Sequence, residues 1–471
     1  MKKFTSLFLV VIILSLVLNA CGESMSPAAP TSGVILQEGN NLPQTSLQPK
    51  QSRELKDNRI GGMWTLDSSA IPTPEQYADW LNGLVYGINN LGLKWVHSSI
   101  DRFDWNVVEE YSKYYIDSQQ DKAITDLVNN GIKIRYCIVF WDEAIQVEEE
   151  GYSRFKTEDE IQRYLDYVHF IVHHFKDRIE YYEILNEPNV GKGTQQYVEV
   201  EDYINLVKRT VPIIRQEYPE AKIVAGAVTP LIEPGAREYF FDILKSDVMP
   251  LVDAVSWHPM GGASPEYEEE HYYNHPSLLQ EIKDVASSNG FEGEYIADEL
   301  HWRSHKDPHP HEYWGYSETT VGKYFARGIL MHRGMGFTTG LCGIWHDWEL
   351  YSPRMMVVRN LCTIMAGTEP ASLPIEIQSE ATNIRSYSFC LTNGDQLIAL
   401  WTDGVAVDED PGVKATLTLP GFSAQEVMGI DVLNGFEQQM ITSIENGNPV
   451  IRNLLVKDYP IIFRFIAIRY P

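Results

Sequence analysis

Two glutamates, each directly after a short apolar run, are the side chains of this chain best placed for chemistry. The first, Glu187, lies in the segment IEYYEILNEPN at residues 179–189. The residues before it predict a buried strand, and Pro188 ends that strand because proline has no N–H to offer a sheet. Asn186 and Glu187 are therefore left at the strand's C-terminal tip. Taken alone, this pattern fits a solvated strand end equally well.

The second glutamate is Glu299, in the segment GEYIADELHW at residues 293–302. Residues 295–297 predict another short strand, which ends in Asp298 and Glu299. Adjacent residues of a strand point to opposite sides, so we expect only one of these two carboxylates to enter the same space as Glu187. Two carboxylates in different environments can cleave a glycosidic bond, one as the acid and the other as nucleophile or base.

The elements that must position these residues are short apolar strands that alternate with helices. Eight strands can be placed, at residues 59–64, 93–100, 132–140, 179–186, 222–227, 252–258, 295–297 and 341–348. Helices are expected to begin at Thr73 and Thr157, with Gln76 and Glu160 completing capping boxes. Eight strands favour an α/β fold, a closed (β/α)8 TIM barrel over residues 59–370. The C-terminal strand ends of such barrels carry the reactive side chains.

The last hundred residues have a different texture. Short β-type runs follow one another from residue 371 onward, with a turn signal at the Asn-Gly-Asp of residues 393–395 and no helical period. We therefore predict a β-sandwich accessory domain over residues 371–471. A structural role for it is favoured over a role as a carbohydrate-binding module.

The combination of Asn186-Glu187-Pro188 after one strand and Glu299 after a later one resembles glycoside hydrolase clan A. About 110 positions separate the two glutamates, which leaves room for the units between strands 4 and 7. The resemblance covers residues 60–367 and points most to the family 39 and family 5 branches. It implies a retaining glycosidase, with Glu187 as acid/base and Glu299 as nucleophile. It also implies a hydrogen bond from the sugar 2-hydroxyl to Asn186.

The resemblance extends to further binding residues. His258, at the end of the sixth strand, could orient the nucleophile or bind a sugar hydroxyl. Trp345 and Trp348 are candidates for the platform beneath the sugar ring, and Trp345 is preferred. Clan members often carry an arginine near the end of strand 2. His97 stands at the matching position here, and Arg102 follows five residues later. The nucleophile therefore lacks its usual cationic neighbour unless Arg102 supplies it, and we expect His97 and Arg102 to be substrate-binding residues.

Two other classes of function remain open at this stage. One is a non-catalytic carbohydrate-binding lipoprotein on a degenerate barrel. The other is a metal-dependent hydrolase that uses the histidines of the loop at residues 301–311. Prolines interrupt that loop and no HExxH pattern occurs, so we expect no metal and no cofactor.

The N-terminus predicts export. Lys2 and Lys3 precede an apolar run at residues 7–18, and Leu-Asn-Ala-Cys at residues 18–21 resembles a bacterial lipobox. Residues 1–20 are therefore predicted to be a lipoprotein signal peptide, and Cys21 the lipidated residue. Residues 21–58 are rich in Ser, Pro, Gln and Asn and predict a flexible tether.

The charge of the chain narrows its partners. The net charge is −27 and the pI about 4.8, which argues against binding to nucleic acid because phosphate binding needs basic surface. We expect a carbohydrate substrate, a membrane contact through the lipid anchor alone, and a monomer. The expected location is the cell envelope or cell surface.

Overall fold

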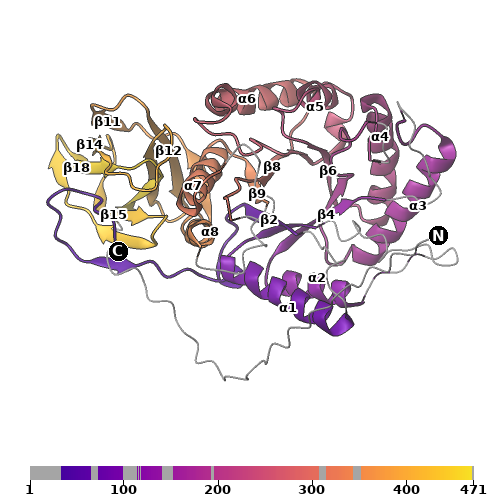
Figure 1. Cartoon of the computed structure of the whole chain (residues 1–471), viewed down its shortest axis with the longest axis horizontal. Helices are drawn as coiled ribbons and strands as arrows, with labels where there is room; N and C mark the ends of the chain where they lie inside the picture. The colour runs from indigo at the N-terminus through magenta and orange to yellow at the C-terminus, as the bar shows by residue number, and fades with distance from the viewer. Residues whose placement is uncertain are drawn as a thin grey trace, which may run out of the picture. The chain divides into compact units, whose positions relative to one another are not determined.

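Eight parallel strands close into a barrel in the order β2-β3-β4-β5-β6-β7-β8-β9, surrounded by helices (Figure 1). The computed structural model describes residues 33–64, 73–98, 114, 116, 118–140, 152–192, 196–306, 315–342 and 352–468. The barrel strands are β2 Ile60–Trp64, β3 Trp95–Ser98, β4 Lys133–Ile138, β5 Tyr181–Ile184, β6 Lys222–Val228, β7 Ala254–Trp257, β8 Glu294–Leu300 and β9 Thr338–Leu341. The predicted (β/α)8 barrel is confirmed.

The helices are α1 Pro74–Leu91, α2 Ser118–Asn129, α3 Glu158–Phe175, α4 Val200–Glu217, α5 Ala236–Leu244, α6 Glu269–Ser288, α7 Glu318–Gly334 and α8 Pro353–Ile364. Two of them begin where the sequence predicts. The Thr73 side chain accepts from the Gln76 N–H at 3.2 Å, and the Thr157 side chain accepts from the Glu160 N–H at 3.3 Å. No helix within the described ranges is long and apolar enough to cross a lipid bilayer.

The eighth barrel strand lies earlier in the chain than predicted. It was expected at residues 341–348, but β9 spans Thr338–Leu341. Its register is fixed by pairing with β2 on one side and β8 on the other, where Thr339 lies opposite Ile60 and Ala297. The two β-branched threonines suit a strand, but the apolar and aromatic residues after them gave the stronger hydropathy signal. Trp345 and Trp348 therefore follow the strand, outside the described residues.

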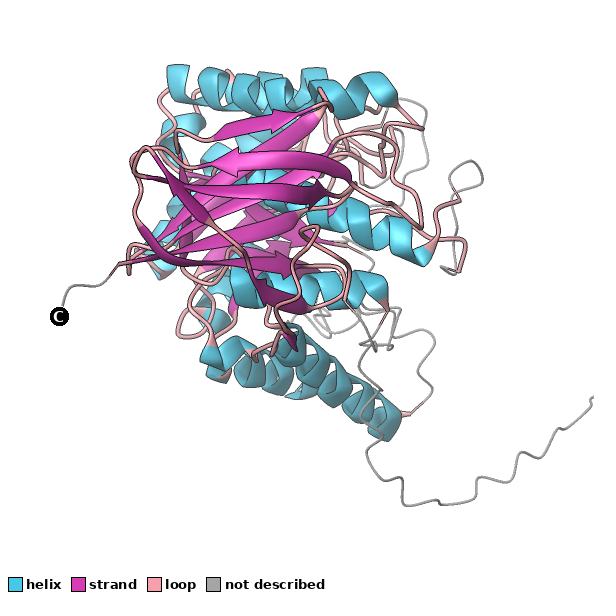
Figure 2. Ribbon diagram, turned by 90° about the vertical axis from the view of Figure 1, so that its left-hand side faces the viewer, coloured by secondary structure: helices cyan, strands magenta, loops and turns pink. Residues whose placement is uncertain are grey.

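Two antiparallel sheets form the C-terminal region, which confirms the predicted β-sandwich (Figure 2). The larger sheet has the order β1-β16-β15-β19-β13-β12-β10 and the smaller the order β11-β14-β18-β17. The strands are β1 Gln44–Ser46, β10 Thr368–Ala371, β11 Glu376–Ser379, β12 Ile384–Leu391, β13 Gln396–Thr402, β14 Val413–Thr418, β15 Ala424–Asp431, β16 Phe436–Gln439, β17 Ser443–Glu445, β18 Asn448–Val456 and β19 Ile461–Ala467.

The predicted tether needs a correction from residue 33 onward. Strand β1 pairs with β16 at the edge of the larger sheet, so this segment belongs to the β-sandwich. Leu36 is 1% exposed, and the Gln37 amide donates to the carbonyls of Ile441 and Arg452 at 2.9 Å each. The polar composition suggested a solvated chain. It instead supplies backbone and amide hydrogen bonds to a sheet edge, which needs few apolar side chains. The rest of the predicted tether, with Cys21, lies outside the described residues.

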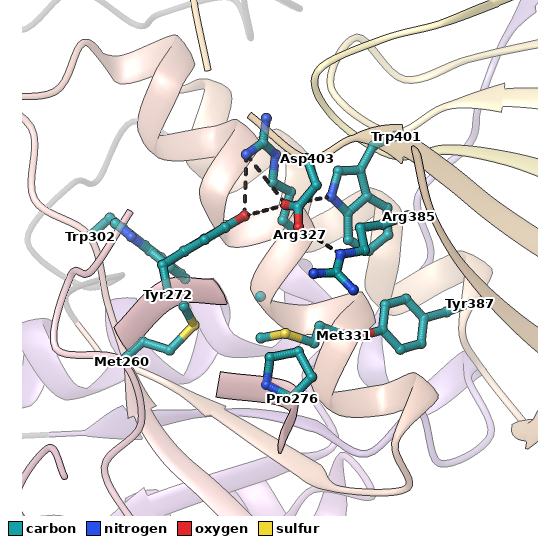
Figure 3. A pocket seen from close by; sticks show the side chains of 11 residues that line it. Met260, Tyr272, Pro276, Trp302, Arg327, Met331, Arg385, Tyr387, Trp401 and Asp403 are labelled. Carbon is teal, nitrogen blue, oxygen red and sulfur yellow. Dashed lines mark hydrogen bonds and ion pairs between the residues drawn. The ribbon is translucent and has the colours of Figure 1, made fainter. Parts of the chain in front are cut away.

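The barrel and the sandwich pack together as one compact unit, residues 33–471. A buried arginine forms part of the junction between them. Arg327 of α7 is 2% exposed and donates to the carbonyls of Gly404 at 2.6 Å and Asp458 at 2.8 Å. It also donates to the Tyr272 hydroxyl at 3.2 Å, and that hydroxyl donates to Asp403 at 2.7 Å (Figure 3). A buried cation with this many partners supports a structural role for the sandwich.

Replacing Arg327 tests this junction. Arg327→Met leaves the carbonyls of Gly404 and Asp458 without their buried donor, and it removes one of the two cations beside Asp403, the other being Arg385 at 2.8 Å. Breaking such a buried pair typically lowers the free energy of unfolding by about 3–5 kcal/mol. Denaturant unfolding would measure the loss. Arg237→Met is the matched control, because Arg237 pairs with Glu281 at 2.7 Å on the surface and exposed pairs contribute about 0–1 kcal/mol. Equal losses in the two variants would contradict a buried junction.

Candidate functional site

The backbone leaves the strand conformation where the barrel strands β5, β6 and β8 end. Left-handed φ values occur at Leu185 (61°), Glu187 (45°), Ala227 (46°) and Glu299 (52°). The register of β8 against β9 also shifts, between Ala297 and Leu300. Such bulges aim side chains in directions that a regular strand does not allow. A left-handed φ costs free energy for residues other than glycine, and residues with such strained backbone conformations cluster at functional sites in proteins.

The two predicted glutamates come together at this face of the barrel with His258, which follows β7. Glu187 Oε1 lies 3.0 Å from His258 Nδ1, and His258 Nε2 lies 3.5 Å from Glu299 Oε1. One carboxylate oxygen of each glutamate and a ring nitrogen of His258 all lie within 4.8 Å of one another. The Glu187 side chain is 26% exposed, that of Glu299 13% and that of His258 2%. We call these three residues the carboxylate trio.

The electrostatics of the trio favour a charged imidazole. Burial lowers the pKa of His258, but the charge of Glu299 and the hydrogen bond with Glu187 outweigh it and raise that pKa above its ordinary value. The ring hydrogen-bonds Glu187 through Nδ1 and attracts Glu299 by charge across 3.5 Å. His258 therefore links the two glutamates, by a hydrogen bond on one side and an ion pair on the other.

Asn186 presents an acceptor that the surrounding protein does not satisfy. Its Oδ1 is buried and has no hydrogen-bond partner among the described residues. Buried polar atoms are nearly always paired, so an unpaired one beside a site points to a ligand hydroxyl or a water. The backbone there is held by the Glu187 N–H, which donates to the Ala227 carbonyl at 2.8 Å.

The structure places His97 deeper than the predicted substrate contact, inside the barrel and only 3% exposed. Its Nε2 lies 2.9 Å from Glu183 Oε2, and its Nδ1 lies 2.8 Å from Asp298 Oδ2. Arg135 pairs with Asp298 and lies 3.5 Å from Glu183. We call His97, Arg135, Glu183 and Asp298 the buried quartet. Arg102, the other candidate cation, lies outside the described residues, as do Trp345 and Trp348.

Asp298 and Glu299 lie in different places, as expected, but strict strand alternation is not what separates them. Asp298 enters the barrel interior and pairs with His97 and Arg135, whereas Glu299 reaches His258 at the mouth. Both are possible because the left-handed φ of Glu299 and the register shift in β8 break the strand alternation. Gly340 of β9 makes room below, because a Cβ at that position would overlap Oδ1 of Asp298.

The quartet contains two carboxylates and two basic groups, whose charges cancel when all four are ionised. Burial and Arg135 lower the pKa of His97, but contacts with Glu183 and Cys137 raise it to about 9. Burial raises the pKa of Glu183, but Arg135 and His97 lower it to about 2. Sequence reasoning missed Arg135 and Glu183. The signal was a charged residue within each apolar strand run, since such residues are rarely buried unless they are paired.

Two groups of side chains within the described ranges have the geometry of metal ligands. One is the carboxylate trio, and the other is His97, Cys137 and Glu183. Arg135 beside the second group opposes a further cation. In the histidine-rich loop, Nδ1 of His301 lies 2.9 Å from the Glu299 carbonyl, and burial lowers the pKa of His301 to about 4. His305 is exposed, and the loop's other two histidines lie outside the described residues.

No protein-family model matches this sequence, and no curated protein matches it either. Solved structures do share its fold. A family 39 glycoside hydrolase from Bacteroides cellulosilyticus WH2 matches with a TM-score of 0.63 at 15% identity, over 89% of this chain and 83% of that one. The bifunctional glucanase-xylanase CelM2 from a metagenome library matches with a TM-score of 0.58 at 11% identity. This match covers 90% of this chain and 99% of that one.

A monomeric β-xylosidase from Caulobacter crescentus CB15 matches with a TM-score of 0.54 at 12% identity, over 90% of this chain and 98% of that one. These matches span both the barrel and the sandwich. The chain therefore has the fold of clan A glycoside hydrolases, as the sequence resemblance implies.

The buried quartet predicts a loss of stability in alkali. The pKa of His97 in the folded state, about 9, lies above its unfolded value near 6.5. Its contribution to stability is therefore complete below about pH 6.5 and disappears as the pH rises through about 9. We expect the melting temperature of the wild type to fall between pH 7 and pH 9.5 by more than that of His97→Gln.

Thermal unfolding at both pH values would measure this difference. His174→Gln is the control, because His174 pairs with Asp121 at 2.7 Å on the surface and is replaced without touching the quartet. The same alkaline fall in wild type and His97→Gln would contradict a charged His97.

Proposed function

We propose that this protein is a retaining glycoside hydrolase, with Glu187 as acid/base and Glu299 as nucleophile. The observation that carries the proposal is the approach of the two carboxyl groups, because one oxygen of Glu187 lies within 4.8 Å of one oxygen of Glu299 at the barrel mouth. Retaining glycosidases hold their carboxyl groups about 5–5.5 Å apart, whereas inverting ones need about 6.5–9.5 Å to admit a water. The short spacing supports direct attack by one of them.

The first chemical step forms a bond between a Glu299 oxygen and the anomeric carbon. The bond from that carbon to the leaving oxygen breaks, and Glu187 gives this oxygen its proton. In the second step, water attacks the anomeric carbon while Glu187 takes a proton from it, and the Glu299 ester breaks. The unpaired Oδ1 of Asn186 is suited to accept from the sugar 2-hydroxyl.

His258 supports both roles through its position between the glutamates. Its raised pKa favours the imidazolium, whose charge attracts the Glu299 side chain and helps to hold it in place. The contact with Glu187 Oε1 holds the acid at the other side. Both carboxyl groups thus start the reaction with their positions set, which reduces the ordering needed in the transition state.

For the substrate we propose the β-linked xylosides and glucosides suggested by the folds that this chain shares. The similar structures include a β-xylosidase and a glucanase-xylanase. Purified protein would be tested on aryl β-xylosides, β-glucosides and α-L-arabinofuranosides and on the matching polysaccharides. Binding of these sugars without turnover of any would indicate instead the non-catalytic carbohydrate-binding lipoprotein.

Glu299→Ala tests the nucleophile. Without this carboxylate no glycosyl ester forms, so we expect turnover of aryl glycosides to fall by at least about 10⁴-fold. Azide at high concentration should restore turnover and give the glycosyl azide of inverted configuration, because it attacks from the vacated side. Proton NMR of the product would measure the configuration. A retained product, or full activity without azide, would exclude Glu299 as the nucleophile.

Glu187→Ala tests the acid/base. Substrates whose leaving group is a good one, such as dinitrophenolate, need no protonation and should still form the glycosyl-enzyme quickly. Natural glycosides should lose about 10²–10⁴-fold in kcat/KM. Comparison of kcat/KM for the two substrate types measures the difference, because kcat/KM reports formation of the glycosyl-enzyme. Glu281→Gln, on the surface of α6, is the control that should leave both rates unchanged. Equal losses on both substrates would assign Glu187 another role.

We also propose that Cys21 is lipid-anchored and that the protein is exported to the cell envelope. The support is the sequence pattern at residues 1–21. Cell fractionation of the wild type and Cys21→Ser tests it: the wild type should sediment with membranes and the variant should be released. A wild type found free of membranes would contradict the anchor.

A further inference from the structure

We infer that the buried quartet is a positioning device for Glu299, which holds the nucleophile toward His258 through its neighbour Asp298. This inference rests on the proposed function, which gives Glu299 the role of nucleophile. Whether the quartet determines the position of the Glu299 side chain can be tested without measuring turnover.

The quartet joins four different barrel strands directly below the carboxylate trio. His97 comes from β3, Arg135 from β4, Glu183 from β5 and Asp298 from β8. Each side chain is at most 5% exposed. The Ser256 hydroxyl of β7 extends the connections, since it donates to Glu183 at 2.5 Å and accepts from the Ala227 N–H at 2.9 Å. Six consecutive strands, β3 to β8, are thus tied together beneath the site.

Asp298 links the quartet to the mouth of the barrel, because it directly precedes Glu299 in the chain. Two basic groups, His97 and Arg135, hold the Asp298 carboxylate from one side. Behind it lies Gly340, whose missing side chain leaves the space that Oδ1 occupies. With the Asp298 side chain fixed, the chain must turn sharply to continue, and Glu299 adopts its φ of 52°.

This turn decides where the Glu299 carboxylate points. In a regular strand the residue after Asp298 would face away from the barrel interior. The left-handed φ of Glu299 returns its carboxylate to within 3.5 Å of His258 Nε2. On the far side of the turn, the Glu299 carbonyl contacts the His301 ring at 2.9 Å. A costly backbone conformation persists only where its surroundings enforce it, and the quartet is the buried part of those surroundings.

Because the charges of the quartet cancel, variants can distinguish its effect on the position of Glu299 from an electrostatic effect on the trio. Two acidic and two basic side chains cancel, so the intact quartet adds little net charge below the trio. A variant that removes one acid and one base together keeps that balance but loses the ties to Asp298. His97→Gln with Asp298→Asn is such a charge-balanced double variant. Gly340→Ala is a second route, since its methyl group would displace the Asp298 carboxylate and change no charge.

The first measurement follows the ring of His258 by NMR in protein with labelled histidine, assigned with His258→Gln. Glu299 is a cause of the raised pKa of His258. If the quartet positions Glu299, the pKa of His258 should fall by about one unit or more in both the double variant and Gly340→Ala, because the carboxylate moves away. An unchanged His258 pKa in folded variants would overturn the inference, whatever the enzyme's activity.

The second measurement is kinetic, on an aryl glycoside that the wild type hydrolyses. Displacement of a reacting group by about 1 Å can cost about 10²-fold, so we expect kcat to fall by that order, with KM within about threefold. The rate of covalent labelling by a 2-deoxy-2-fluoro glycoside should fall in parallel. A wild-type kcat in the folded variants would also overturn the inference. A wild type without glycosidase activity would instead refute the proposed function and leave the NMR result to decide the inference.

Matched controls separate positioning from lost stability. Lys323 and Asp458 form another buried ion pair, at 2.7 Å with side chains 1% and 6% exposed, at the junction of barrel and sandwich. Lys323→Met with Asp458→Asn removes one acid and one base there. It should lower the unfolding midpoint but leave kcat and the His258 pKa unchanged. Gly87→Ala in α1, where a Cβ meets nothing within 4 Å, is the control for Gly340→Ala.

Discussion

Closure of the barrel is the constraint on which the rest of the structure depends. Strand β9 must pair with β2 as well as β8, so no strand can shift its register without moving its neighbours. The register shift at Ala297 and Leu300 is therefore fixed by the whole barrel. It is also the feature that allows Asp298 to enter the interior while Glu299 reaches the mouth. The geometry of the site is a product of closure as much as of local sequence.

A closed barrel of eight strands has an interior that side chains must fill. Apolar residues fill part of it here, as with Trp95, Tyr181, Val224 and Ile296. The layer below the glutamates is instead occupied by paired charges. Removing charges from water is costly, and mutual pairing offsets much of that cost. The gain is directional: ion pairs fix orientations that apolar packing leaves free, and the nucleophile's neighbour Asp298 is one of the groups so fixed.

Much of the fold was predictable because the alternation of strands and helices produces a recognisable hydropathy pattern in short stretches of sequence. Capping threonines located two helix starts, and Pro188 located the end of β5. The eighth strand was misplaced because Thr338 and Thr339 are less apolar than the residues after them. The edge strand β1 was missed because hydrogen bonding to β16, a long-range contact, leaves no trace in composition.

The candidate site was also predictable in part: its residues at the strand ends were found, but the arrangement of the buried ones was not. The strand-tip motifs identified Glu187 and Glu299, and the end of the sixth strand identified His258. The return of Glu299 to the barrel mouth, directly after an inward-facing Asp298, was not predictable, because a left-handed φ at a glutamate follows from its surroundings and not from its own preference. The place of His97 was also hidden, since its partners come from three other strands.

The junction around Arg327 bears on how such a protein could arise and diverge. A domain held by loose surface contacts can be lost or exchanged by recombination at little cost. Here Asp458 of the sandwich accepts from the barrel's Arg327 through its carbonyl and pairs with Lys323 through its carboxylate, so a barrel freed from the sandwich would expose two cations that have lost these partners. Selection then acts on barrel and sandwich as one heritable block. Chimeras that join this barrel to a foreign C-terminal domain would have to supply acceptors at the same two points.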